Sequence, residues 1–188
     1  MKDGGGARPH EQRGGSVEPR PRPSERGRQV AVIGSGGCGE GSEAWTLAEE
    51  VGRRLAEAGA TVVCGGRGGV MEAVARGAAG VGGTVIGVLP WVSIDEANPY
   101  CTEVVATGIG QARNLAVVAS GEATIAVSGE WGTLAEIAHA RNLDRTVVAL
   151  RSWSVTGREQ MEGGPGIVAV ETAEEAVAAA LDAIGVHD

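Results

Sequence analysis

The sequence predicts an α/β fold: a single doubly wound parallel sheet with helices on both faces. Short apolar runs alternate with helix-like segments from Gln29 onward, and this order is typical of βαβ units with right-handed crossovers. The 188 residues are 43% hydrophobic but only 3% aromatic. A core of Val, Ala, Ile and Leu suits strands that are buried on both faces by Ala-rich helices. The length allows one compact domain.

Each predicted strand is a short β-branched run that ends near glycine, proline or a charged residue. The predicted strands cover residues 29–34, 60–66, 83–90, 102–107, 122–129, 145–151 and 166–170. The predicted helices cover residues 44–58, 69–80 and 109–120, a segment from about Thr133, and a segment from Thr172 through Ile184. The first helix places its apolar residues three and four positions apart. The last begins with a capping box, Thr172 and Glu175.

Residues 1–28 differ in composition from the rest of the chain. They are rich in Gly, Pro, Arg and Glu and nearly free of large apolar side chains, so they bury too little surface to offset their ordering entropy. We expect a disordered tail at 1–28 and one folded domain at 29–188. A cloning remnant or a mis-called start codon is the alternative explanation of the tail.

Charge and cysteine content exclude several classes of protein. The net charge is −8, and seven of the 16 basic residues lie within 1–28, so the acidic remainder is a poor partner for a nucleic acid polymer. No apolar run is long enough to span a membrane, and we expect a cytoplasmic protein. The three cysteines lack metal-ligand spacing, so no metal site is predicted. Cys38 is more simply a small filler residue than a reactive thiol.

Three glycine-rich turns follow predicted strands, at 34–39, 65–69 and 128–132. Loops at the carboxyl ends of parallel strands converge on one crevice, and free amides at helix N-termini bind anions. These turns therefore predict one site for an anionic small molecule. The residues predicted to bind phosphate or nucleotide in the first two turns are Gly34, Ser35, Gly36, Gly65, Gly66, Arg67, Gly68 and Gly69. Arg67 is either a phosphate ligand or an exposed loop charge.

The first turn also fits G-x-G-x-x-G through Gly34, Gly36 and Gly39. Dinucleotide binding needs an acidic residue at the end of the second strand to hold the ribose hydroxyls. That strand ends at Cys64 and then glycines. NAD is therefore rejected, and no cofactor is predicted.

The segments "GGRGGVMEAVARGA", "GTVIGVLP" and "GIGQARNLAVVASGEATIAVSGEWGTLAEIA" resemble the LOG-like superfamily of Rossmann-fold nucleotide-binding proteins, once described as lysine decarboxylases. The resemblance covers about residues 29–150 and is closest to the molybdenum-cofactor-carrier-like branch. It implies a homo-oligomer, a dimer or higher. Decarboxylation through a Schiff base is discounted because the chain has no lysine beyond Lys2.

LOG-like enzymes hydrolyse the N-glycosidic bond of nucleoside 5′-monophosphates. Carried over by position, the resemblance implies Arg113 and Glu136 as the catalytic pair. It implies phosphate contacts from Gly129, Gly132 and Thr133. A carboxylate can stabilise positive charge on the ribose or orient the attacking water. An arginine can hold that carboxylate ionised and bind phosphate.

Two features depart from the family pattern. Glu130 stands where P-G-G-x-G-T has its second glycine, and this costs energy if the position needs φ > 0. Two outcomes are open: the side chain of Glu130 turns to solvent and leaves the phosphate site intact, or the site has lost or changed its anion and the hydrolase activity with it. "QARN" stands where the hydrolases have H-x-R-K.

A structural alternative exists for Glu136. Thr133-x-x-Glu136 also matches a capping box, in which Glu136 would only stabilise its helix.

Three functions therefore stay open. The leading hypothesis is a nucleotide-binding protein with phosphoribohydrolase activity. The second is a non-catalytic carrier of a phosphorylated cofactor such as molybdopterin. The third is an oligomeric interaction protein whose pocket is vestigial.

Overall fold

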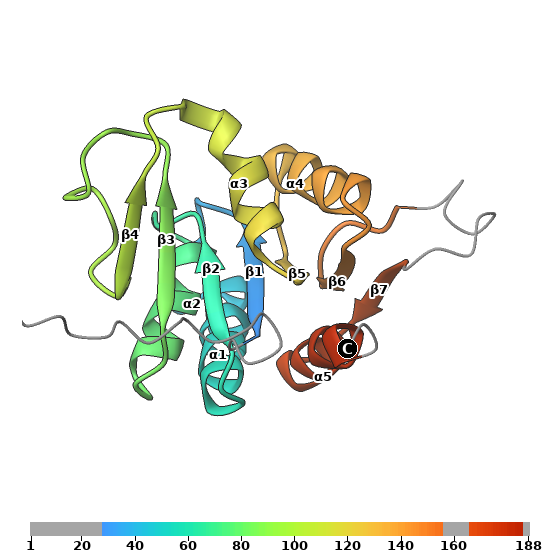
Figure 1. The fold of residues 1–188 in the computed structure, drawn as a ribbon. Helices are drawn as coiled ribbons and strands as arrows, with labels where there is room; N and C mark the ends of the chain where they lie inside the picture. Colours follow the sequence, from blue (N-terminus) through green and yellow to red (C-terminus); the bar gives the residue numbers. More distant parts are fainter. Residues whose placement is uncertain (1–27, 156–165, 186–188) are drawn as a thin grey trace, which may run out of the picture.

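A computed structural model describes residues 28–155 and 166–185 of the chain. The predicted tail, 1–28, lies outside this part except for Arg28. The division into a tail and a folded domain therefore stays a prediction. The described residues form one sheet with helices on both of its faces (Figure 1).

The strands form a parallel sheet in the order β4-β3-β2-β1-β5-β6-β7. They are β1 (Gln29–Gly34), β2 (Thr61–Cys64), β3 (Val85–Leu89), β4 (Glu103–Ala106), β5 (Ala123–Val127), β6 (Thr146–Leu150) and β7 (Ile167–Val170). All seven predicted strands are confirmed in the described residues. The inner strands β1 and β5 are buried, as expected for strands covered on both faces.

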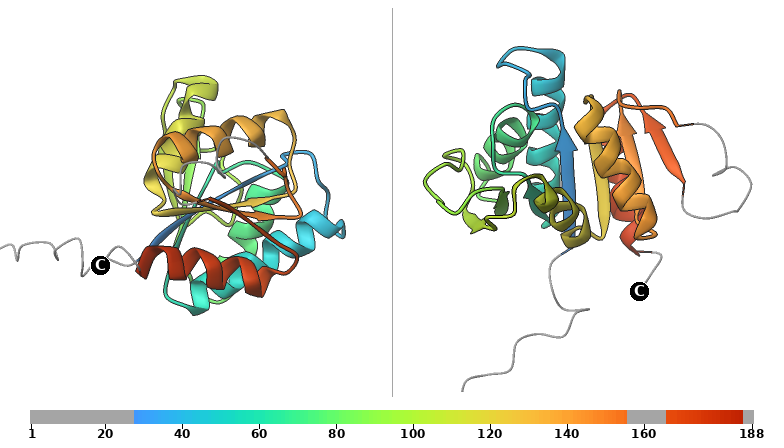
Figure 2. Two further views of the ribbon diagram at one scale, coloured as in Figure 1. Left: turned by 90° about the vertical axis from the view of Figure 1, so that its right-hand side faces the viewer. Right: turned by 90° about the horizontal axis from the view of Figure 1, so that it is seen from above.

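The helices form two layers, which Figure 2 shows on opposite sides of the sheet. They are α1 (Glu43–Glu57), α2 (Val70–Ala79), the 3₁₀ helix η2 (Gly110–Ala112), α3 (Arg113–Ser120), α4 (Trp131–Asn142) and α5 (Ala173–Gly185). Helices α1, α2 and α5 share one apolar core with the sheet. Helices α3 and α4 build a smaller core on the other face. The predicted doubly wound fold is therefore confirmed.

The chain reverses its direction of winding between β1 and β5. From β1 it builds outward to β4, and from β5 outward to β7, so these two neighbouring strands flank the switch point. Gly34, at the end of β1, pairs with Val127, at the end of β5. In doubly wound sheets the ligand crevice lies at this point, outside the carboxyl ends of the strands.

The two proposed capping boxes have different outcomes. At α5 the Thr172 hydroxyl accepts from the Glu175 amide at 3.2 Å, and the Glu175 carboxylate accepts from the Thr172 amide at 3.1 Å. At α4 the helix begins at Trp131, two residues before the predicted start, and its N-cap is Glu130. The capping-box interpretation of Glu136 is wrong, because Thr133 lies inside the first turn of the helix and is not its cap.

Candidate functional site

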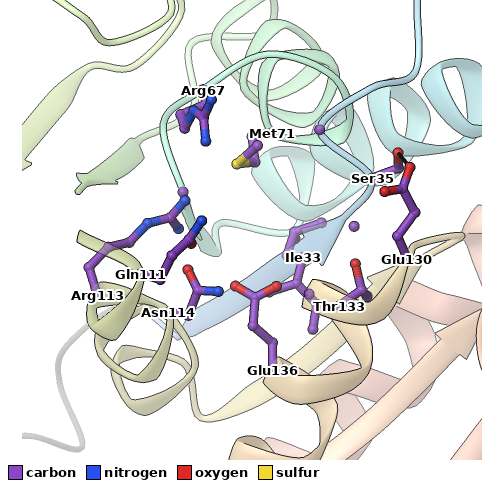
Figure 3. A pocket seen from close by; sticks show the side chains of 15 residues that line it. Ile33, Ser35, Arg67, Met71, Gln111, Arg113, Asn114, Glu130, Thr133 and Glu136 are labelled. Atoms are coloured by element: carbon purple, nitrogen blue, oxygen red, sulfur yellow. Dashed lines mark hydrogen bonds between the residues drawn. The ribbon is translucent and has the colours of Figure 1, made fainter. Parts of the chain in front are cut away.

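A cavity of about 150 Å³ lies at the switch point (Figure 3). All three glycine turns reach it, together with the start of α3 and the first turns of α4. Its lining residues are Val32, Ile33, Gly34, Ser35, Gly36, Gly65, Arg67, Met71, Gln111, Arg113, Asn114, Glu130, Gly132, Thr133 and Glu136. The convergence that the sequence predicted is thus present in the structure.

The first two turns are held against each other by the backbone. The amide of Val70, the first residue of α2, donates to the carbonyl of Ser35 at 2.9 Å. Arg113, the first residue of α3, then extends across the second turn. A Cβ on Gly65 would lie 2.7 Å from Nη2 of Arg113, so only glycine leaves the guanidinium its place there.

Arg113 is a buried cation with an unused donor. Only 5% of the residue is exposed, and its Nε has no hydrogen-bond partner in the structure. Burial lowers the pKa of the guanidinium, and Glu136 acts in the opposite direction. A guanidinium stays charged nonetheless. Buried donors are normally paired, so this arrangement is suited to an acceptor supplied by a ligand.

Glu136 lies on the second turn of α4 and is 7% exposed. Burial raises the pKa of its carboxyl group to about 7, although the charge of Arg113 lowers it. Among the residues that the structure describes, no ion pair joins the two side chains. Burial therefore outweighs the attraction of Arg113 in setting this pKa, and the role of Arg113 in holding the carboxylate ionised stays a prediction. Near neutral pH Glu136 can act as a proton donor or as an acceptor.

Glu130 is not strained. Its φ is −115°, whereas the positive φ of this turn falls on Ser128 and on Gly129, at 118°. The energetic cost that a side chain would have at a position with positive φ therefore does not apply to Glu130. The carboxylate of Glu130 is not directed only toward solvent. It lines the cavity and accepts a hydrogen bond from the Ser35 hydroxyl at 3.3 Å.

The structure sorts the residues predicted from the sequence into two groups. The predicted residues that line the cavity are Gly34, Ser35, Gly36, Gly65, Arg67, Arg113, Gly132, Thr133 and Glu136. Four glycines that support the turns do not line it: Gly66, Gly68, Gly69 and Gly129. Gly129, for example, packs against Thr133, whose Cγ2 would lie 2.6 Å from an added Cβ. The roles of both groups in binding stay predictions.

Gln111 and Asn114 were missed as site residues. Both line the cavity, and in Figure 3 the Asn114 carboxamide is seen between Arg113 and Glu136. The Oδ1 of Asn114 is buried and has no hydrogen-bond partner. The sequence did hold a signal for them, since these are the two positions at which "QARN" departs from H-x-R-K. Two neutral amides stand there in place of two basic groups.

A second hollow adjoins the cavity at Arg67. Its volume is about 310 Å³, and Arg67 and Gly68 line it together with the segment that follows β3. The guanidinium of Arg67 lies 4.9 Å from the centre of the Trp91 ring, within the range of a cation–π contact. The side chain of Asn98, in the segment after β3, donates a 3.0 Å hydrogen bond to the carbonyl of Arg67 and so links that segment to the second glycine turn. Arg67 therefore separates an inner cavity from a wider outer one.

Cys38 lies in the first turn but has no sign of activation. Burial raises the pKa of its thiol, so the thiolate is scarce at neutral pH. This agrees with the interpretation of Cys38 as a filler residue. Within 28–155 and 166–185, no helix has the length and apolar character that crossing a membrane requires.

A doubly wound sheet with glycine turns around its switch point defines a Rossmann-like α/β protein. The chain belongs to the SLOG cluster4 family, whose model matches residues 27–177. It is 40% identical to an uncharacterized protein of Archaeoglobus fulgidus over 149 residues, which are 79% of this chain and 91% of that protein. The predicted membership of the LOG-like superfamily is confirmed.

Two solved structures with similar folds support the predicted branch. The molybdenum cofactor binding protein of Rippkaea orientalis is 26% identical, with a TM-score of 0.76 over 86% of this chain and 99% of that chain. The molybdenum cofactor carrier protein of Chlamydomonas reinhardtii is 28% identical, with a TM-score of 0.72 over 85% and 99%. The chain therefore lies near the carrier-like branch, as its motifs indicated.

Proposed function

We propose that this protein binds a phosphorylated nucleotide or a nucleotide-like cofactor in the cavity at the switch point. The observation that carries the proposal is the buried Arg113, whose Nε has no partner. A charged donor that is desolvated and unpaired is costly unless a ligand completes it. Arg67 adds a second positive charge to the lining. Together the two guanidinium groups are suited to an anionic group of the ligand, while Glu130 and Glu136 bring negative charge to other parts of the lining.

The size of the site supports a ligand with two parts. A typical small-molecule site has a volume of about 300–1,000 Å³, and the inner cavity has only about 150 Å³. The outer hollow adds about 310 Å³ beyond Arg67. A sugar or phosphate group would occupy the inner cavity, while a heterocyclic ring would extend past Arg67 toward Trp91.

The specific enzymatic hypothesis is hydrolysis of a nucleoside 5′-monophosphate. Water would add to C1′ as the N-glycosidic bond breaks, and the base would leave with the bonding electrons and take up a proton. Glu136 supports this step because its pKa of about 7 allows proton transfer at neutral pH. Arg113 would bind the ribose phosphate or its hydroxyls. The products would be ribose 5-phosphate and the free base.

The alternative function is a carrier that binds its ligand without converting it. The similarity to the cofactor-binding proteins of Rippkaea and Chlamydomonas favours it. The amides of Gln111 and Asn114 also favour it, because they can neither protonate a leaving base nor add positive charge to the cavity. A molybdopterin-type ligand combines a phosphate with a ring system and fits the two-part site.

One assay separates the two functions. The protein is incubated with AMP, GMP, CMP and IMP, and free bases are separated by chromatography. Release that disappears in Glu136→Gln supports the hydrolase. No release, together with thermal stabilisation by a ligand that is recovered unchanged, supports the carrier. At 100 times its dissociation constant such a ligand adds about 2.7 kcal/mol of stability. If none of these nucleotides nor a molybdopterin ligand changes the melting temperature, the binding proposal is wrong.

A further inference from the structure

The side chain of Glu130 extends from the N-terminus of α4 to the first glycine turn (Figure 3). Its Oε1 accepts a hydrogen bond of 3.3 Å from the Ser35 hydroxyl. The same hydroxyl accepts a 3.2 Å hydrogen bond from the amide of Gly37. A carboxylate of the protein is therefore already bound at the turn that the sequence marks for a ligand anion.

The Ser35 hydroxyl can serve only one anion. A hydroxyl has one proton to donate in a hydrogen bond, and Ser35 donates it to the Glu130 carboxylate. A phosphate that needs this donor must displace the carboxylate, and while Glu130 remains near, the two negative charges repel each other. Competition at Ser35 thus weakens the binding of phosphate.

The fold does not require Glu130 to stay at Ser35. Its backbone is extended, and its side chain makes no capping bond to its own helix. The indole of Trp153 donates to the Glu130 carbonyl at 3.2 Å, so the main chain is held independently of the carboxylate. The residue is exposed at the mouth of the cavity. The carboxylate can therefore move, or be replaced, without loss of the fold.

We propose that Glu130 is a specificity-determining residue that reduces the preference of the cavity for a phosphomonoester over the same ligand without its phosphate. This rests on the proposed function, because it assumes that the ligand phosphate approaches the first turn. In the wild-type protein the phosphate of a nucleotide competes with an internal carboxylate. The cavity should therefore discriminate less between a nucleotide and its nucleoside than it would with a neutral residue at position 130.

The test compares a nucleoside with its 5′-monophosphate. Adenosine, AMP and inorganic phosphate are titrated by calorimetry into the wild-type protein and Glu130→Gln, which keeps the shape and removes the charge. We expect the affinity ratio of AMP to adenosine to rise about tenfold in Glu130→Gln. The neutral amide oxygen competes less strongly than a carboxylate for the Ser35 hydroxyl, and it does not repel the phosphate; tenfold is about the size of one hydrogen bond to a charged group. Adding Ser35→Ala to Glu130→Gln should reverse the gain. Glu103→Gln, the same change of charge at the opposite end of the sheet, should leave the ratio unchanged.

The outcomes separate this inference from the proposed function. If both proteins bind AMP with the same ratio to adenosine, Glu130 is no specificity residue, while the binding proposal survives. If only Glu130→Gln binds AMP or phosphate, the role of Glu130 is supported and phosphate binding by the wild-type protein is not. If neither protein binds any of the three probes, the role of Glu130 is overturned, while the binding proposal is decided by the wider set of nucleotides and the molybdopterin ligand named above.

Discussion

The guanidinium of Arg113 occupies the space above Gly65 that a side chain would fill. A Cβ at this glycine would lie 2.7 Å from Nη2 of Arg113 and 2.6 Å from Sδ of Met71. Two segments that are 48 positions apart in the sequence thus depend on each other at the cavity. Because Gly65 has no side chain, the buried guanidinium of Arg113 can lie against the second glycine turn.

We expect Gly65→Ala to impair the site more than the fold. The displaced atoms are the ends of two flexible side chains, and Gly65 does not have a positive φ, so the free energy of unfolding should change by about 1 kcal/mol or less. Ligand affinity should fall at least about tenfold, because Arg113 must leave its position. Urea denaturation and calorimetry measure the two effects. Gly39→Ala is the matched control, since a Cβ at Gly39 meets nothing within 4 Å. Equal losses in both variants would contradict the role of Gly65.

Arg113→Met should separate stability from binding. Replacing a buried, unpartnered cation with an apolar side chain of similar length is expected to leave stability unchanged or to raise it by about 1 kcal/mol. Binding of the anionic ligand should be lost. Denaturation and thermal shift with AMP test this. Arg53→Met is the control, because Arg53 lies on α1 outside the cavity, makes partly exposed ion pairs with Glu50 and Glu57, and should leave binding intact. A loss of 3 kcal/mol or more in Arg113→Met, on the order seen when a buried pair is broken, would show that the guanidinium is structurally paired.

Glu136 should make the protein less stable as the pH rises. Its folded pKa of about 7 lies above the ordinary value of 4.5, so the folded state holds the proton more tightly. The stability that comes from this tighter proton binding is fully present below about pH 4.5 and is lost as the pH rises to about 7. A shift of this size corresponds to about 3 kcal/mol.

The measurement for Glu136 is a difference between two proteins. Unfolding free energies of the wild-type protein and Glu136→Gln are compared at pH 5 and pH 8. The variant should gain stability relative to the wild type at pH 8, while Glu103→Gln, an exposed carboxylate, should show a much smaller change. A constant difference at the two pH values would mean that Glu136 is ionised throughout.

Thr172→Ala should destabilise the protein by about 1 kcal/mol through loss of the α5 cap. The hydroxyl satisfies the Glu175 amide, and without it this donor has no side-chain acceptor in the box. Thr172→Ser keeps the hydroxyl and is the control. Chemical denaturation of the three proteins measures the effect, and equal stability of Ala and Ser variants would contradict it.

The hydrophobic pattern predicted the sheet because each strand is a local run that must be buried on both faces. The glycine turns at 34–39, 65–69 and 128–132 were likewise visible, because glycines clustered directly after a strand are typical of tight turns. The start of α4, in contrast, could not be read from the sequence. Thr133 and Glu136 match a capping box in the sequence, but the helix begins at Trp131 because the turn before it is made by Ser128 and Gly129 with positive φ.

The sequence alone determined the order of strands and helices along the chain. It also predicted a ligand site at the carboxyl ends of the strands and, through the family resemblance, the pair Arg113 and Glu136, which the structure places in one cavity. Only the tertiary structure decided the ionisation of Glu136 and the direction of Glu130. Burial of Glu136 depends on the packing of α4 against the sheet, and the partner of Glu130, Ser35, is 95 residues away. Both properties arise from the environment of a side chain, and long-range packing creates that environment.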